Sequence, residues 1–82
     1  MDAMGRMVDE AREAIVDYLR IRPGAADTAE GIARWWVYPA TGENDLDVVR
    51  TALDLLEQRG EVEPQHVRNR LLYRAGPALR GG

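Results

Sequence analysis

The stretch Asn44–Arg74, NDLDVVRTALDLLEQRGEVEPQHVRNRLLYR, determines the fold expected for this chain of 82 residues. Its first half repeats apolar residues at three- and four-residue steps as far as Leu56, which predicts an amphipathic helix. Gly60 follows as a residue that readily adopts the left-handed conformation at a helix end. Residues 61–63 and 70–74 then have the pattern of two short strands joined by a turn. The stretch therefore predicts a helix that leads into a β-hairpin.

The predicted helix has a capped start and a broad apolar face. Asn44 is the expected cap, and Asp45 and Asp47 lie in the first turn, where the helix dipole favours negative charge. The residues expected on the inner face are Leu46, Val49, Ala52, Leu53 and Leu56, widened by Val48 and Leu55. This face predicts that the helix packs into the core of the domain.

Two further helical patterns precede this stretch. Residues 6–20 carry one apolar stripe and should form the first helix, which a Pro-Gly pair ends. Asp27 is the expected cap of a second, shorter helix that ends near Val37. Residues 38–43, which include a proline and a glycine, are then expected to form a loop. The predicted order is three helices and a hairpin.

This order resembles a winged helix-turn-helix domain. The residues that carry the resemblance are Leu53, Leu56, Gly60, Val62, Leu71 and Tyr73. It implies an α+β fold, mainly α, with three helices and a two-stranded hairpin, the wing, over residues 6–75. It also implies that Asp45–Arg59 is the recognition helix and that Pro64–Asn69 is the wing tip. The ends, residues 1–5 and 76–82, are expected to be flexible.

The composition argues against catalysis and against metal binding. The chain contains no cysteine, serine or lysine, and His66 is its single histidine. Thiol and serine nucleophiles, Schiff-base lysines and multi-histidine metal sites are therefore excluded. No glycine-rich phosphate loop is present, so no cofactor is expected. No apolar run is long enough for a signal peptide or a membrane span, and we expect a cytoplasmic protein with no membrane partner.

Charge is distributed unevenly along the chain, whose net charge is −3. Residues 1–63 contain all fourteen acids and seven arginines, a net charge of −7. Residues 64–82 contain four arginines and no acid, a net charge of +4. The acids Asp9, Glu10, Glu13 and Asp17 are expected to form a solvated face of the first helix. The chain is thus an acidic helical body with a basic hairpin and tail.

The third helix argues against DNA binding. Its outward face is expected to hold the acids Asp47, Asp54 and Glu57, with Arg50 and Thr51 as the candidates for DNA contacts. Carboxylates facing a duplex repel its phosphates, which supply most of the affinity. The predicted connection before this helix is also about seven residues, against about three or four in a tight helix-turn-helix.

The hairpin favours the opposite interpretation. If Val67, Leu71 and Tyr73 face the core, then Arg68, Arg70 and Arg74 face outward together and could contact phosphate. Alternatively, these arginines pair with acids of the same domain as ordinary surface charges. A basic hairpin on an acidic body also suits an acidic partner or head-to-tail self-association.

An aromatic segment supplies the candidate surface for a protein partner. Trp36 is expected in the core, whereas Trp35 either covers the helix edge or forms an exposed patch with Tyr38 and Pro39. We prefer a non-enzymatic protein–protein interaction module that uses this patch or the acidic face of Asp47, Asp54 and Glu57. The alternative is a DNA-binding regulator. Either a monomer or a homodimer is compatible with the sequence.

Overall fold

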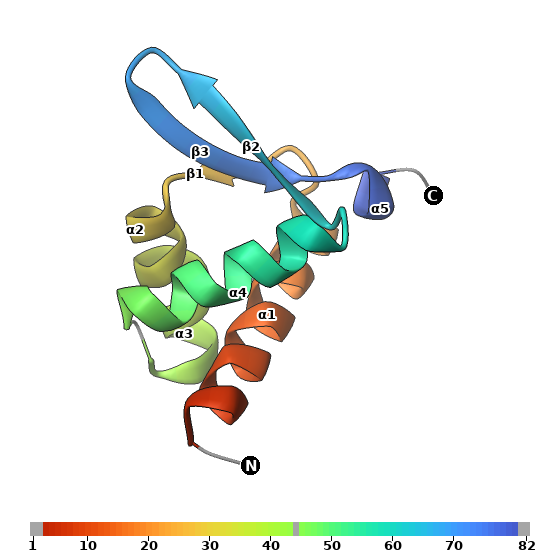
Figure 1. The fold of residues 1–82 in the computed structure, drawn as a ribbon. Coiled ribbons are helices and arrows are strands. Elements are labelled where there is room, and N and C mark those ends of the chain that lie inside the picture. The colour runs from red at the N-terminus through yellow and green to blue at the C-terminus, as the bar shows by residue number, and fades with distance from the viewer. Residues whose placement is uncertain (1–2, 44, 81–82) are drawn as a thin grey trace.

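The computed structural model describes residues 3–43 and 45–80, and Figure 1 gives its elements. The helical part consists of α1 (Ala3–Ile21), α2 (Ala29–Gly31), the π-helical segment η1 (Ile32–Val37), α3 (Tyr38–Thr41), α4 (Leu46–Gln58) and α5 (Pro77–Arg80). The strands are β1 (Ala26–Asp27), β2 (Val62–Val67) and β3 (Arg70–Ala75). The fold is α+β and mainly helical, with a winged-helix-like order of elements. None of the described helices is long and apolar enough to cross a membrane.

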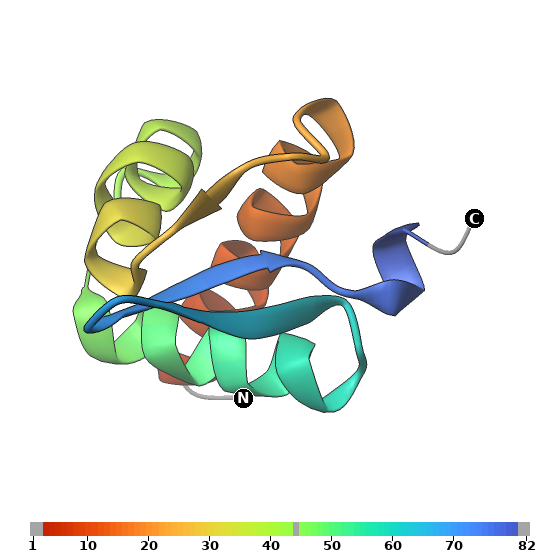
Figure 2. The ribbon, with the colours of Figure 1, turned by 90° about the horizontal axis from the view of Figure 1, so that it is seen from above.

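The sheet has three strands, not the two that the sequence predicted. Its order is β1-β3-β2, and both pairings are antiparallel. In β1, Ala26 pairs with Arg74 and Asp27 pairs with Tyr73. Two residues carry no alternation that a sequence pattern can detect, which is why this strand was missed. The sheet covers one side of the helices, and its β2–β3 hairpin projects beyond them (Figures 1 and 2).

The core lies where α1, η1 and α4 meet the base of the hairpin. The buried side chains are Val8, Ala11, Ala14, Ile15, Leu19, Ala29, Ile32, Ala33, Trp36, Val37, Val48, Val49, Ala52, Leu53, Leu56, Val62 and Ala75. These include the predicted inner residues of α4, apart from Leu46 and Leu55, which are half-buried, and the predicted core residue Trp36. Tyr18 stacks on Trp36 with ring centroids 4.3 Å apart.

Both predicted helix caps lie one residue away from the observed ones. Thr28 caps α2 by accepting a hydrogen bond from the Gly31 amide, while Asp27 accepts one from the Thr28 amide. Asp45 caps α4 and accepts from the amides of Asp47 and Val48. The expected cap Asn44 lies outside the described residues. Both helices were predicted correctly. The caps are shifted because neighbouring polar residues compete for the cap position.

The second helix does not end at Val37. It continues through Thr41, with Pro39 in the first turn of α3, so the loop predicted for residues 38–43 is mostly helical. The turn before Pro39 is widened, because the Tyr38 amide donates its hydrogen bond to the carbonyl of Ala33, five residues earlier. A wide turn moves the preceding carbonyls away from a proline ring that would otherwise clash with them. Four positions, 42–45, now connect α3 to α4, which is the length of a tight helix-turn-helix.

The hairpin follows α4 after a left-handed turn at Gly60, as the sequence predicted. The φ angle of Gly60 is 72°. Its strands are longer and its turn is shorter than expected: Val67 pairs with Arg70, so the turn is Arg68-Asn69 alone. His66 is therefore in a strand and not in the turn. Arg68 has a φ of 59°, a conformation that costs an L-residue on the order of 1 kcal/mol or more.

The chain after β3 forms the short helix α5, where no regular structure was predicted. Gly76 is buried, and its amide bonds the carbonyl of Glu61. The Ala78 amide bonds the carbonyl of Gly60, which connects α5 to the end of α4. At the other terminus, α1 begins at Ala3, three residues earlier than predicted. Residues 1–2 and 81–82 lie outside the described residues.

Candidate functional site

The outward face of α4 has the composition that the sequence predicted. Asp47, Arg50, Asp54 and Glu57 are all exposed. The Arg50 guanidinium lies 3.7 Å from a carboxylate oxygen of Glu30, so the one cation of this face is partly neutralised. Thr51 is exposed, but its hydroxyl donates to the carbonyl of Asp47 at 2.9 Å. This face therefore offers three carboxylates that form no ion pair with another described residue, and little for a phosphate.

The three wing arginines do not act together. Arg74 donates to Glu63 through Nε at 2.9 Å and lies 2.8 Å from it through Nη2, and Arg80 lies 2.8 Å from the same oxygen. Arg68 and Arg70 take part in no ion pair with another described residue. The interpretation that these arginines pair with acids of their own domain thus holds for Arg74. Within the hairpin, the arginines without an ion pair to another described residue therefore lie at its tip.

The hairpin tip is apolar as well as basic. Val67 is 41 % exposed and Leu71 is 38 % exposed, so neither faces the core as the sequence analysis assumed. Val67 pairs with Arg70 and His66 pairs with Leu71, which places Val67 and Leu71 on opposite faces of the hairpin. The observed end of the hairpin thus differs from the predicted Pro64–Asn69. From here on, the wing tip means Val67, Arg68, Arg70 and Leu71. Among the three predicted inward residues, only Tyr73 is half-buried.

Tyr73 lies between the hairpin and the acidic face of α4. Burial raises the pKa of its phenol above the ordinary value of 10.0, and the carboxylates of Asp54 and Glu57 raise it further. Arg50 acts against them and lowers it. The neighbouring hollow of about 480 Å³ is lined by Thr28, Ala29, Glu30, Arg50, Arg70, Leu71 and Tyr73. Desolvation is the largest of these causes, so the raised pKa of Tyr73 reflects mainly the partial burial of its phenol.

The aromatic segment behaves as the exposed-patch interpretation predicted. Trp35 is 61 % exposed, and Tyr38 and Pro39 are also exposed, whereas Trp36 is 4 % exposed and belongs to the core. The Arg34 guanidinium lies over the Trp35 ring, 5.1 Å from its centroid. Because the helix continues through Pro39, Trp35, Tyr38 and Pro39 stand at i, i+3 and i+4 on one side of it.

A groove lies next to Trp35, and its other wall was not predicted from the sequence. The groove has a volume of about 430 Å³ between the C-terminal half of α1 and the η1–α3 segment. Its lining, mostly apolar, is Ala14, Asp17, Tyr18, Ile21, Arg22, Trp35, Trp36, Pro39 and Ala40. We call it the aromatic groove. Ile21 is 74 % exposed. Its three-residue step from Tyr18 is the signal that could have placed it on this side of α1.

The aromatic groove continues into an acidic hollow. The hollow has a volume of about 370 Å³ and is lined by Glu10, Glu13, Ala14, Asp17, Ala40 and Thr41. It shares Ala14, Asp17 and Ala40 with the groove, so the two form one depression along α1. Glu10, Glu13 and Asp17 take part in no ion pair with another described residue. The depression is therefore apolar at one end and negative at the other.

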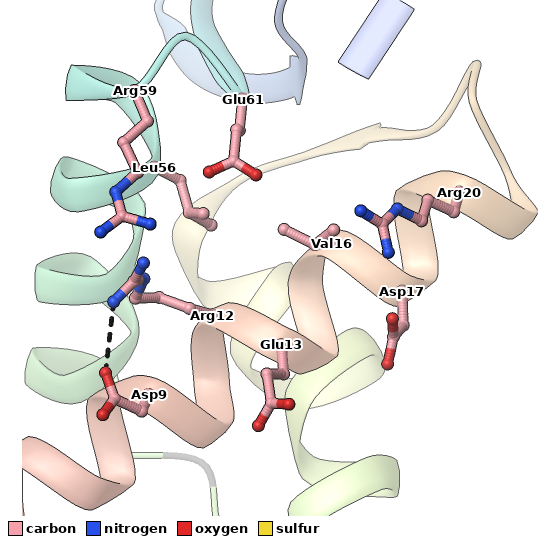
Figure 3. A pocket seen from close by; sticks show the side chains of 9 residues that line it. All are labelled: Asp9, Arg12, Glu13, Val16, Asp17, Arg20, Leu56, Arg59 and Glu61. Atoms are coloured by element: carbon pink, nitrogen blue, oxygen red, sulfur yellow. Dashed lines mark hydrogen bonds and ion pairs between the residues drawn. The ribbon is translucent and has the colours of Figure 1, made fainter. Parts of the chain in front are cut away.

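The hollow of about 510 Å³ between α1 and the end of α4 has a mixed charge (Figure 3). Its charged lining comprises Asp9, Arg12, Glu13, Asp17, Arg20, Arg59 and Glu61. Arg12 lies 3.2 Å from Asp9, and its guanidinium and that of Arg59 extend toward each other. The opposite charges largely cancel, which leaves no net attraction for one kind of ion. The described residues contain no group of three or more potential metal ligands.

Comparisons with protein-family models, with curated proteins and with solved structures give no match for this chain.

Proposed function

We propose that this chain is a winged-helix domain that acts as a non-enzymatic protein-interaction module and binds its partner in the aromatic groove. The observation that carries the proposal is the exposure of Trp35 and Ile21 on opposite walls of that groove. Large exposed apolar residues beside a concave surface are typical of interaction sites, and tryptophan is enriched among the residues that dominate binding energy. Loss of Trp35 should therefore weaken binding strongly.

The chemistry of the other surfaces supports this choice. The sequence contains no serine, cysteine or lysine, so nucleophilic catalysis would depend on weaker groups. The acidic face of α4, with Arg50 close to Glu30, opposes binding of a duplex to the helix that would enter its groove. The acidic hollow at one end of the aromatic groove favours partner segments that combine apolar side chains with arginine or lysine.

The test uses random peptides as the probe, because no partner is needed to begin. A displayed library of 12-residue peptides would be selected against the full chain, and enriched peptides would be titrated into 15N-labelled protein. We expect apolar, basic peptides that shift the Trp35 indole and the amides of Tyr18 and Ile21. Trp35→Ala should abolish these shifts, whereas Val67→Ala, an exposed apolar change on the wing, should retain them. Shifts confined to α4 and the wing would overturn the proposal.

DNA binding is the second candidate function. Two observations favour it: the connection of four positions between α3 and α4, and the wing-tip arginines Arg68 and Arg70, which form no ion pair with another described residue. A generic 16-base-pair duplex, added to the same labelled protein at about 50 mM salt, tests it under conditions that strengthen phosphate contacts. Shifts in α4 and residues 66–74 that salt reverses would favour DNA. An unchanged spectrum would eliminate this candidate.

A further inference from the structure

The wing tip and the depression along α1 are complementary in polarity. The wing tip presents Val67 on one face of the hairpin and Leu71 on the other. The aromatic groove has two apolar walls, with Tyr18 and Ile21 on α1 and Trp35 on η1. A hairpin end that is apolar on both faces can contact both walls at once. The tip is therefore a suitable occupant for the groove.

The charges of the two surfaces are also complementary. Arg68 and Arg70 lie beside the apolar residues of the tip and form no ion pair with a described residue. The acidic hollow supplies Glu10, Glu13 and Asp17, which likewise form none with the part of the chain that the structure describes. Opposite charges around an apolar contact fix its register and direct the encounter of the two surfaces.

Two further arginines border the aromatic groove. Arg22 lies over the Tyr18 ring at 4.8 Å, and Arg34 lies over the Trp35 ring at 5.1 Å. Both would repel Arg68 and Arg70 of a docked tip. The arginines of the tip are thereby directed toward the acidic end of the depression, away from the end that Arg22 occupies.

The two surfaces cannot meet within one molecule. The hairpin rises from the end of α4 and projects beyond the helices (Figure 1), and Arg70 and Leu71 share a hollow with the start of α2. The C-terminal half of α1 and the η1–α3 segment lie on the side of the molecule away from the hairpin (Figure 2). The tip of one chain can reach the groove only in another chain.

We infer that the wing tip of one copy of this chain docks in the aromatic groove and acidic hollow of a second copy. The inference rests on the proposed function of the groove. Because tip and groove are different surfaces, two arrangements are compatible with the contact. Two copies can exchange wings reciprocally around a twofold axis, which gives an isologous dimer, or copies can add head to tail through a heterologous contact. An insertion this small buries little surface, so the association should be weak and should depend on concentration and salt.

The conformation of Arg68 agrees with a role for the tip. Its φ of 59° is one that glycine or asparagine adopts at lower cost, and the next residue in the turn is an asparagine. An arginine at this position gives up some stability and places a charge at the extreme end of the hairpin. The lost stability is consistent with a function for this charge, namely contact with a partner.

Charge reversal tests the inference with the protein alone. Sedimentation of the 9.2-kDa chain from 10 µM to 1 mM should show association that about 0.5 M salt reverses. Arg70→Glu and Glu13→Arg should each weaken it about tenfold, because each places like charges opposite one another. Mixing the two variants should restore association, since the carboxylate introduced in one variant then faces the guanidinium introduced in the other across one contact. Both sites are on the surface, and circular dichroism would verify that each variant folds.

A spectroscopic readout locates the contact. In 15N-labelled Glu13→Arg, the Trp35 indole should shift when unlabelled Arg70→Glu is added, but not when unlabelled Glu13→Arg is added. A chain that remains monomeric at 1 mM, or a mixture that does not associate, would overturn self-association. So would association that leaves the Trp35 indole unchanged. Peptide binding in the groove would persist in each of these cases, so failure here is distinguishable from failure of the proposed function.

Discussion

At the residue scale, Trp35 and Trp36 are adjacent in the chain and differ in the energy that each contributes. Trp36 is 4 % exposed and stacks on Tyr18, whereas Trp35 is 61 % exposed. We expect Trp36→Ala to lower the free energy of unfolding by about 3–5 kcal/mol through the cavity it leaves. Trp35→Ala should change it by less than about 1 kcal/mol. Urea denaturation followed by circular dichroism measures both, and a large loss from Trp35→Ala would make that residue structural.

Because of Tyr73, we expect the free energy of unfolding to depend on pH in the alkaline range. Its pKa is raised by burial first and by Asp54 and Glu57 next, so the folded state holds the phenolic proton more tightly than the unfolded state. Its contribution to stability is complete below the ordinary pKa of 10.0 and is lost as pH rises from there through the folded pKa. The chain has no lysine or cysteine, whose ordinary pKa values lie near this range.

The expected result is a fall in the free energy of unfolding as pH rises above about 10, which urea denaturation at several pH values would measure. Tyr73→Phe should make the fall smaller. Asp54→Asn should lower the pKa of Tyr73, which the phenolate absorbance would report, and Asp9→Asn on α1 serves as the control. Equal slopes in the wild type and in Tyr73→Phe would contradict the prediction.

At the scale of elements, hydrophobic periodicity predicted the features that depend on one helix alone. The apolar faces of α1 and α4 and the left-handed end at Gly60 follow from local spacing, and the structure confirms them. What the sequence did not predict depends on contacts between distant segments. Strand β1 exists only because it pairs with β3, and α3 continues past Pro39 because a widened turn accommodates the ring.

The candidate site was predicted to the same extent. An exposed patch of Trp35, Tyr38 and Pro39 was one of the two interpretations of this segment, but Tyr38 and Pro39 were expected in a loop, and their place on one helix with Trp35 was not predicted. The opposite wall was not predicted either, because Ile21 lies one residue beyond the predicted end of the first helix. The face that Leu71 and Tyr73 share was predicted correctly, but Val67 was wrongly assigned to it, since the assumed turn of six residues hides the pairing of Val67 with Arg70. A shift of one residue exchanges the faces of a strand.

Gly76 controls how α5 packs against the end of α4. A Cβ atom at this position would overlap the backbone carbonyl of Gly60, which is not free to rotate away. We expect Gly76→Ala to lower the free energy of unfolding by about 1–3 kcal/mol, as overpacking does. Gly24→Ala is the matched control, because nothing lies within 4 Å of its added Cβ atom. Chemical denaturation compares the two variants, and equal stabilities would show that α5 moves away at little cost.

At the scale of the whole molecule, net charge and its placement have separate consequences. The fold has the element order of domains that bind DNA, yet Asp47, Asp54 and Glu57 cover the outward face of α4. If these acids keep DNA away, then neutralising them should allow binding. The variant Asp47→Asn/Asp54→Asn/Glu57→Gln should bind a generic duplex at 50 mM salt at least about tenfold more tightly than the wild type, which corresponds to about 1.4 kcal/mol.

The control for this variant has the same net charge and a different distribution. Glu10→Gln/Glu13→Gln/Asp17→Asn removes three acids from α1 that line a hollow with Ala40 and Thr41 and with no residue of α4. Fluorescence anisotropy of a labelled duplex would measure both affinities as a function of salt. A gain confined to the α4 variant means that the position of the acids prevents binding. Equal gains would mean that net charge alone does so, and the face of α4 would then have no special part in excluding DNA.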